Sequence, residues 1–291
     1  MTQRLDEVLR AATDRLREAG VAAPRGDAER LAAHVLGVTA GAVPAAAITG
    51  RSLPDAAATR FADLVAQRAE RIPLQHLTGR AAFRTIELDV GPGVFVPRPE
   101  TEVVAGLAIA AAQELDEPLV VDLCTGSAAI ALSVAVELRT ARVVALEADP
   151  LAHAWAARNV ERIAPGRVDL RLGDVADPEA LADLTGRVDV VVANPPYIPD
   201  GARPVDPEVA DHDPHLALYG GGADGLAVPA AVVRCAAVLL RTGGALVMEH
   251  GDVQGAAARR LVRAAGGWAD VRTERDLTGR DRALLACRSA R

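Results

Sequence analysis

The stretch Val188-Asp189-Val190-Val191-Val192-Ala193-Asn194-Pro195-Pro196-Tyr197 decides the fold of this chain. Its first six residues form an apolar run of the kind found in a strand that is buried on both faces of a parallel sheet. An open α/β sheet carries its chemistry just beyond the carboxyl ends of its strands. We therefore expect residues 194–197 to form a functional loop at such an edge.

The residue types of this loop suit a planar substrate group that carries an NH2. The side-chain oxygen of Asn194 can accept one N–H, and the carbonyl of Pro195 can accept the other. Pro195 and Pro196 have a fixed φ and no N–H, so the loop is stiff and presents acceptors, while Tyr197 can stack on the planar group. Two acceptors aimed at one NH2 raise the electron density on a poor nucleophile, so a carboxamide or the exocyclic amine of a base is the predicted substrate group. The alternative is a proline-rich turn that only caps a strand.

Outside this stretch the pattern predicts three parts. Residues 1–75 carry apolar residues at helical spacing and predict a small helical domain. In residues 76–98, alternating apolar residues, a Gly91-Pro92-Gly93 turn and Val94-Phe95-Val96 predict a β-hairpin linker. Residues 99–291 alternate strands with helices and predict an α/β catalytic domain. Its strands are expected at 119–123, 142–146, 168–172, 188–193 and 245–249, followed by an antiparallel pair near 271–274 and 283–287.

Composition limits the function classes. The net charge of −7 argues against the broad basic face of a nucleic-acid-binding protein. Three widely spaced cysteines, Cys124, Cys235 and Cys287, predict neither a disulfide framework nor a zinc site. The sequence has no signal-peptide core and no apolar stretch of membrane-spanning length. We expect a cytoplasmic protein with no membrane partner and no bound metal.

A second group of residues, at the ends of three successive predicted strands, predicts a site for a nucleoside cofactor. After the strand at 119–123, Cys124-Thr125-Gly126-Ser127 turns into a helix that begins near Ala128, and small residues there let a ligand approach backbone N–H groups. Glu147 ends the next strand, where an acid typically bonds ribose hydroxyls. Asp174 follows the third strand, where a carboxylate can accept from an adenine amine. Each of these residues could instead be a solvent-exposed residue at the end of a strand. Their order along the chain nevertheless predicts a cofactor that lies across the edge of the sheet.

Taken together, the chain resembles the class I S-adenosylmethionine-dependent methyltransferases, and among them the protein-(glutamine-N5) methyltransferases that modify peptide chain release factors. The resemblance covers nearly the whole chain, and its segments are as follows: Pro73-Leu74-Gln75-His76-Leu77-Thr78-Gly79, Val96-Pro97-Arg98-Pro99-Glu100-Thr101-Glu102, the turn from Asp122 to Ile130, Asn194–Tyr197, and Glu249-His250-Gly251. The Asn-Pro-Pro-Tyr motif is shared with DNA adenine-N6 methyltransferases, so its combination with the first two segments is the more specific signal.

The resemblance implies a Rossmann-like seven-stranded methyltransferase sheet with S-adenosylmethionine as cofactor and a release factor as protein substrate. The implied substrate-holding residues are Asn194, Pro195, Pro196 and Tyr197. The implied cofactor-binding residues are Asp122, Cys124, Thr125, Gly126, Ser127, Ala128, Glu147, Asp174 and Asn194. Glu249-His250-Gly251 is read as a packing element at the sheet edge rather than a site. We expect a monomer without a stable nucleic-acid partner.

The chain departs from the family pattern D-x-G-x-G-x-G in the cofactor turn. Cys124 and Ala128 stand at two of the glycine positions, and only Gly126 remains. A side chain at such a position can crowd the ligand or require a disfavoured φ. Two alternatives follow from the residues: an N6-adenine or guanine-N2 methyltransferase of nucleic acid, and an adaptor in which the altered turn has weakened catalysis. A ribosomal-protein glutamine is a further possible target.

Overall fold

The computed structural model describes residues 3–290, and their contacts divide them into two compact units. The helical unit contains the chain up to Arg80 together with Val205–His212, and the catalytic unit contains Ala81–Pro204 and Asp213–Arg291. The helical unit thus includes a short segment that lies far along the chain, after the Asn-Pro-Pro-Tyr loop.

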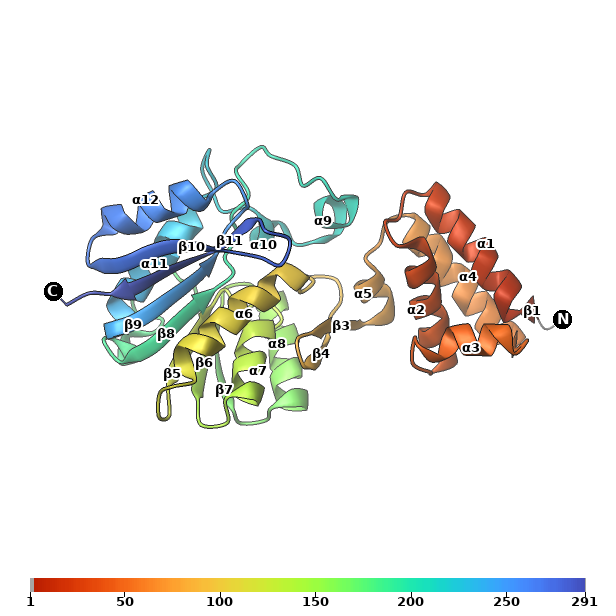
Figure 1. The fold of residues 1–291 in the computed structure, drawn as a ribbon, viewed down its shortest axis with the longest axis horizontal. Helices are drawn as coiled ribbons and strands as arrows, with labels where there is room; N and C mark the ends of the chain where they lie inside the picture. The colour runs from red at the N-terminus through yellow and green to blue at the C-terminus, as the bar shows by residue number, and fades with distance from the viewer. Residues whose placement is uncertain (1–2, 291) are drawn as a thin grey trace. The chain divides into compact units, whose positions relative to one another are not determined.

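The helical unit is built mainly from helices. They are α1 (Leu5–Glu18), α2 (Pro24–Leu36), α3 (Ala42–Ile48), α4 (Asp55–Ala69), α5 (Leu74–Thr78) and α9 (Pro207–His212), and a short antiparallel pair joins β1 (Gln3–Arg4) to β2 (Ser52–Leu53). Leu5, Leu9, Leu31 and Phe61 are buried in one core. Gly37 ends α2 in the left-handed conformation that favours glycine. Figure 1 shows α1 to α5 in red to orange and α9 in teal.

The catalytic unit contains the seven-stranded sheet that was predicted. Its strands run in the order β10-β11-β9-β8-β5-β6-β7, with bounds β5 (Leu119–Leu123), β6 (Arg142–Glu147), β7 (Val168–Leu172), β8 (Val188–Ala193), β9 (Leu240–Glu249), β10 (Trp268–Arg275) and β11 (Asp281–Arg288). The pairs from β7 through β9 are parallel, and β10 and β11 are antiparallel to their neighbours, as the sequence indicated.

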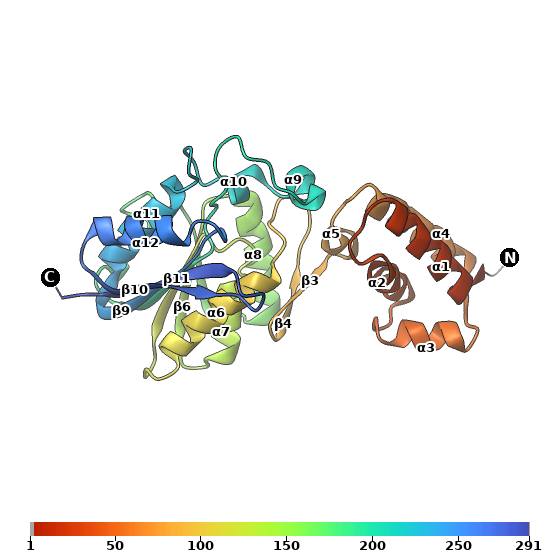
Figure 2. The ribbon, with the colours of Figure 1, turned by 45° about the horizontal axis from the view of Figure 1, so that its top comes forward.

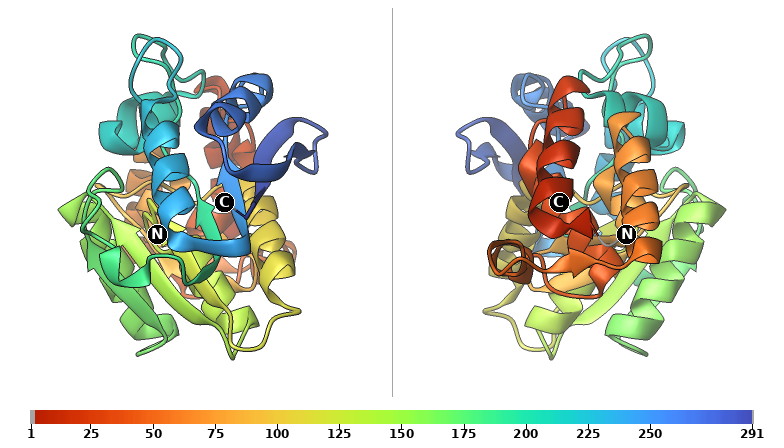
Figure 3. Two further views of the ribbon diagram at one scale, coloured as in Figure 1. Left: turned by 90° about the vertical axis from the view of Figure 1, so that its left-hand side faces the viewer. Right: turned by 90° about the vertical axis from the view of Figure 1, so that its right-hand side faces the viewer.

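Helices cover both faces of this sheet, as the two end views in Figure 3 show. The core on one face joins the sheet to α6 (Pro99–Ala112), α7 (Ala129–Glu137) and α8 (Pro150–Ile163). The core on the other face joins it to α11 (Ala227–Leu239) and α12 (Gly255–Ala265). Short helical turns η1 (Ala182–Leu184) and α10 (His215–Leu218) complete the unit. Burial on both faces explains why β8 is almost entirely apolar.

The strand order places the two candidate sites next to each other. From β5 the chain moves outward to β6 and β7, and then it returns to the other side of β5 to form β8 and β9. Leu123 pairs with Ala193, so the turn after β5 and the loop after β8 begin side by side. This is the topological switch point at which open α/β sheets bind their ligands.

The position of the hairpin turn in the predicted linker was wrong. The two hairpin strands are β3 (Arg80–Phe83) and β4 (Ile86–Asp89), so the chain turns at Arg84 and Thr85, and residues 94–96 form no strand. Figure 2 shows β3 beside β4. Gly91 serves close packing instead, because a Cβ there would lie 2.6 Å from the ring of Trp155. Glycine is favoured both in turns and at close approaches, and the local sequence does not distinguish the two.

Candidate active site

The turn after β5 has a backbone that normally requires glycine. Cys124, Gly126 and Ala128 all have a positive φ, of 60°, 59° and 66° respectively. A Cβ built on Gly126 would meet nothing within 4 Å, so this glycine borders open space, whereas Ala128 is fully buried in the core under α7. The turn therefore carries the disfavoured φ that the sequence suggested, but the Ala128 methyl group points into the core rather than toward a ligand.

Asp122 holds this turn in place from the end of β5. Its Oδ2 accepts hydrogen bonds from the hydroxyl of Thr125 (2.5 Å) and from the backbone N–H of Ala131 in α7 (3.1 Å). Burial raises the pKa of Asp122 to about 7, although the two hydrogen bonds act to lower it. The structure thus places Asp122 behind the turn, where it stabilises the start of α7.

Glu147 at the end of β6 contacts the same turn. It is 8 % exposed, and its carboxylate accepts hydrogen bonds from the N–H of Gly126 (2.7 Å) and of Asp149 (2.9 Å). Burial raises the pKa of Glu147, and the backbone hydrogen bonds oppose this shift. Asp174 lies beyond β7 and is exposed, with its Oδ1 accepting from the N–H of Ala176. The strand order therefore brings the 124–128 turn and Glu147 into direct contact.

The Asn-Pro-Pro-Tyr loop begins directly after β8 and is held by side chains from two other elements. Asn194 Nδ2 donates to the hydroxyl of Thr101 in α6 at 3.1 Å, which leaves Asn194 Oδ1 as the acceptor of this amide. The Tyr197 hydroxyl donates to Glu249 Oε1 at 3.3 Å. Burial, followed by the negative charge of Glu249, raises the pKa of Tyr197. Tyr197 is therefore a neutral hydrogen-bond donor at physiological pH.

Three further residues that the sequence did not single out also hold this loop. The Gln254 side chain donates to the carbonyl of Tyr197 at 2.8 Å. A Cβ on Gly220 would lie 2.6 Å from the carbonyl oxygen of Pro196, and one on Gly225 would lie 2.2 Å from that of Tyr197. The two glycines therefore allow a close backbone approach to the loop. The clustering of glycines at 220–225 was the available signal.

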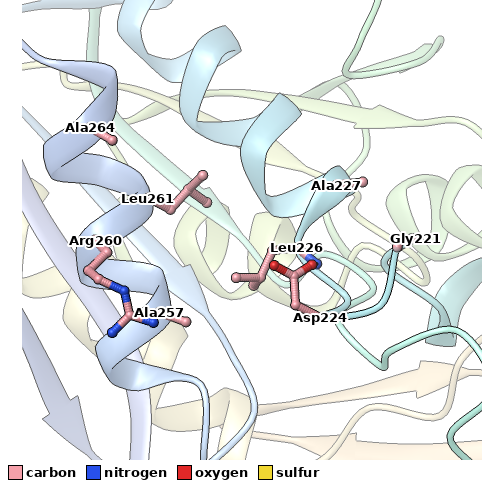
Figure 4. A pocket seen from close by; sticks show the side chains of 9 residues that line it. Gly221, Asp224, Leu226, Ala227, Ala257, Arg260, Leu261 and Ala264 are labelled. Carbon is pink, nitrogen blue, oxygen red and sulfur yellow. The ribbon is translucent and has the colours of Figure 1, made fainter.

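A surface hollow lies apart from these residues. Figure 4 shows it between the start of α11 and the helix α12, where Asp224 and Arg260 border it with Leu226 and Leu261. None of the predicted site residues lines it. Among residues 3–290, no group of three or more His, Cys, Asp or Glu side chains could hold a metal ion, and no helix is long and apolar enough to cross a membrane.

Comparison with known proteins places this geometry in a family. Residues 7–79 match the family model of the PrmC N-terminal domain, and residues 83–209 match that of the methyltransferase small domain. A release factor glutamine methyltransferase of Streptomyces coelicolor is 50 % identical over 94 % of this chain and 95 % of its own length. The enzyme of the same name from Mycolicibacterium smegmatis is 49 % identical over 99 % of both chains.

A second type of methyltransferase and a solved structure are also similar to this chain. A 4-amino-L-phenylalanine/4-methylamino-L-phenylalanine methyltransferase of Streptomyces pristinaespiralis is 41 % identical over 92 % of this chain and 89 % of its own. The crystal structure of a methyltransferase from Pyrococcus furiosus superposes with a TM-score of 0.50 at 17 % identity, over 70 % of this chain and 89 % of that one, which supports the fold. Together with the sequence matches over nearly the full length, these findings show that the chain belongs to the family of release factor glutamine methyltransferases.

Proposed function

We propose that this protein transfers the methyl group of S-adenosylmethionine to the side-chain amide nitrogen of a glutamine in a peptide chain release factor. The observation that carries the proposal is the orientation of Asn194. Its Nδ2 is engaged by Thr101, so its oxygen is available to accept a hydrogen bond at the carboxyl edge of β8. A hydrogen-bond acceptor at this position can bind a substrate NH2 group, whereas it would repel a substrate oxygen that also accepts hydrogen bonds.

The residues at the switch point fit the proposed cofactor. The turn from Cys124 to Ala128 leads into the N-terminus of α7, and Gly126 faces open space, so a ligand can approach the backbone closely. Glu147 supplies a buried carboxylate beside this turn, and carboxylate oxygens accept hydrogen bonds from ribose hydroxyls. We assign Asp174 to the adenine end. Asp122 acts indirectly by fixing the turn.

When bound, the cofactor supplies an electrophilic methyl group on a sulfonium, which is its own leaving group. The chain's contribution is to position and polarise the nucleophile. Asn194 Oδ1 and the Pro195 carbonyl each accept one N–H of the glutamine amide, which turns its nitrogen lone pair toward the methyl group and raises its electron density. These two acceptors would hold the amide nitrogen as the methyl acceptor, and the proton that this nitrogen gives up would leave to solvent. Pro196 stiffens the loop, and Tyr197 packs against the amide plane.

We further propose that the protein works as a monomer in the cytoplasm, where translation terminates, and forms no stable complex with nucleic acid. The acidic net charge of −7 supports the last point. A small aromatic amine is the second candidate substrate, because the Streptomyces pristinaespiralis relative has such an amine in its name and is 41 % identical. Both candidates present a planar NH2 to the same loop.

The decisive experiment supplies the purified protein with methyl-labelled S-adenosylmethionine and one acceptor at a time. The acceptors are an intact release factor, the same factor with its target glutamine changed to alanine, 4-amino-L-phenylalanine, and bulk RNA or DNA. We expect label on the intact factor alone, and mass spectrometry should locate one added methyl group on a glutamine. Faster labelling of the free amino acid or of nucleic acid would reject the proposal.

A further inference from the structure

The turn that follows β9 contacts Tyr197 at two points. Glu249 is the last residue of β9, and Gln254 is the residue directly before α12. Both are buried, with exposed fractions of 2 % and 8 %. Glu249 Oε1 accepts a hydrogen bond from the Tyr197 hydroxyl at 3.3 Å, and Gln254 Nε2 donates to the Tyr197 backbone carbonyl at 2.8 Å. One short segment of chain therefore holds both the backbone and the side-chain tip of Tyr197.

The hydrogen bonds of Gln254 allow only one orientation of its amide. Its Oε1 accepts from the N–H of Gly251 at 2.9 Å, and its Nε2 donates to the carbonyl of Asp224 at 2.9 Å as well as to Tyr197. A reversed amide would place its oxygen against two carbonyl oxygens, and these only accept hydrogen bonds. A Cβ on Gly251 would lie 2.8 Å from Gln254 Oε1, so the glycine makes this approach possible. Gln254 therefore joins three segments of chain in a defined geometry.

Two points of attachment are enough to fix the direction of a tyrosine side chain. The Cβ, the ring axis and the hydroxyl oxygen lie on one line, so the position of the hydroxyl depends only on rotation about the Cα–Cβ bond. Gln254 holds the backbone of Tyr197, and the N–H of the next residue, Ile198, donates to the carbonyl of Leu218 at 2.8 Å. With the hydroxyl also bound to Glu249, the Tyr197 side chain is held in one χ1 rotamer.

We propose that Glu249 and Gln254 are positioning residues that act through Tyr197 and hold its ring in place within the loop that presents the acceptors of Asn194 and Pro195. The inference rests on the proposed function, in which Tyr197 packs against the substrate amide. A ring that is already ordered costs no conformational entropy when the substrate binds, and a preorganised contact contributes to the rate. The segment Glu249-His250-Gly251, which the sequence indicated as a packing element, thus takes part in arranging the site.

One test observes the Tyr197 carbonyl directly and does not need a substrate. Tyr197–Ile198 is the only tyrosine–isoleucine pair in the chain, so labelling with carbonyl-¹³C tyrosine and ¹⁵N isoleucine gives a single signal in a spectrum that correlates each amide with the preceding carbonyl. Gln254→Met keeps the length of the side chain but removes the donor, so it should shift this carbonyl signal. The matched control is Gln113→Met, the same change at an exposed position after α6, which should leave the signal in place.

The second test is kinetic. Gln254→Met and Glu249→Met should each lower kcat on a release factor about tenfold, the effect of one hydrogen bond. The cofactor dissociation constant should change little, because Asp122 and Glu147 hold the cofactor turn separately. Glu249→Gln should restore most of the rate lost in Glu249→Met, since its side-chain oxygen can still accept from the Tyr197 hydroxyl. Thermal unfolding and cofactor titration of each variant show whether it is folded.

The outcomes separate the inference from the proposed function. A wild-type protein that fails to methylate a release factor overturns the proposed function, and the kinetic comparison is then made with the acceptor that it does methylate. A carbonyl signal that is unchanged in folded Gln254→Met overturns the inference, as does a shifted signal with an unchanged kcat, which would leave Gln254 a packing role only. A Glu249→Gln variant that is as slow as Glu249→Met would likewise exclude positioning through the Tyr197 hydroxyl.

Discussion

Glu208 in α9 is predicted to stabilise the helical unit through a pH-dependent charge network. Its carboxylate accepts hydrogen bonds from Arg68 at 2.7 Å and from Arg71 at 2.6 Å, and Arg68 in turn donates to Asp27 at 2.8 Å. Burial acts to raise the pKa of Glu208, but the hydrogen bonds from Arg71 and Arg68 outweigh it and lower the pKa to about 2. The change to test is Glu208→Gln, which keeps the shape and removes the charge.

The size of the effect follows from the pKa shift. A drop from the ordinary 4.5 to about 2 corresponds to about 3 kcal/mol of stabilisation at neutral pH. The Arg71 side chain is 23 % exposed, so solvent screens part of this interaction, and we expect about 1–2 kcal/mol. Because the folded-state pKa is the lower one, this stability is fully present above about pH 5 and is lost as the pH falls toward 2.

The assay must report on the helical unit alone. Both tryptophans and both tyrosines lie in the catalytic unit, so intrinsic fluorescence does not report on the helical one. Hydrogen exchange of peptides from α2 and α4, followed by mass spectrometry between pH 4 and 7, measures its local stability after correction for the intrinsic exchange rate.

The matched control is Glu70→Gln, the same change at an exposed position close to the network. Glu208→Gln should increase exchange at pH 7, and the difference from wild type should shrink at pH 4. Equal protection at pH 7 in Glu208→Gln and wild type would refute the reasoning, as would a difference that grows on acidification.

Three further predictions concern the candidate active site. Asn194→Ala should lower turnover by roughly 10²-fold with little change in cofactor affinity, because it removes one preorganised acceptor; single-turnover kinetics with a release factor would check it. Glu147→Ala should raise the cofactor dissociation constant at least about tenfold, since charge-assisted hydrogen bonds are worth about 1.5–3 kcal/mol each; an unchanged calorimetric titration would contradict a role in binding. Ala128→Gly should change the free energy of unfolding by less than about 1 kcal/mol, because the relief of the positive φ offsets the loss of a methyl group buried in the core. The cofactor dissociation constant should stay the same. Tighter cofactor binding would show instead that the methyl group crowds the ligand.

Much of the candidate site could be predicted because its signals are local. The apolar run of β8 and the rigid acceptor loop at Asn194 occupy one continuous stretch, and the small-residue turn at Gly126 occupies another. The residues that support them could not be predicted in the same way. Glu249 was read as a packing element because a single acidic residue at a strand end gives no indication of what it contacts, and in the structure it accepts a hydrogen bond from Tyr197.

The sequence by itself determined the α/β class, the positions along the chain of the strands of the seven-stranded sheet, and the two loops that follow β5 and β8. These could be predicted because hydrophobic periodicity and turn chemistry are properties of neighbouring residues. Tertiary structure alone decided that Thr101 meets Asn194 across 93 residues of chain and that Glu208 returns to the helical unit. It also decided that the hairpin turns at Arg84 and Thr85, and not at Gly91–Gly93 as the sequence had predicted. These features depend on which distant side chains fit together once the core is packed, and a local pattern carries no information about a distant partner.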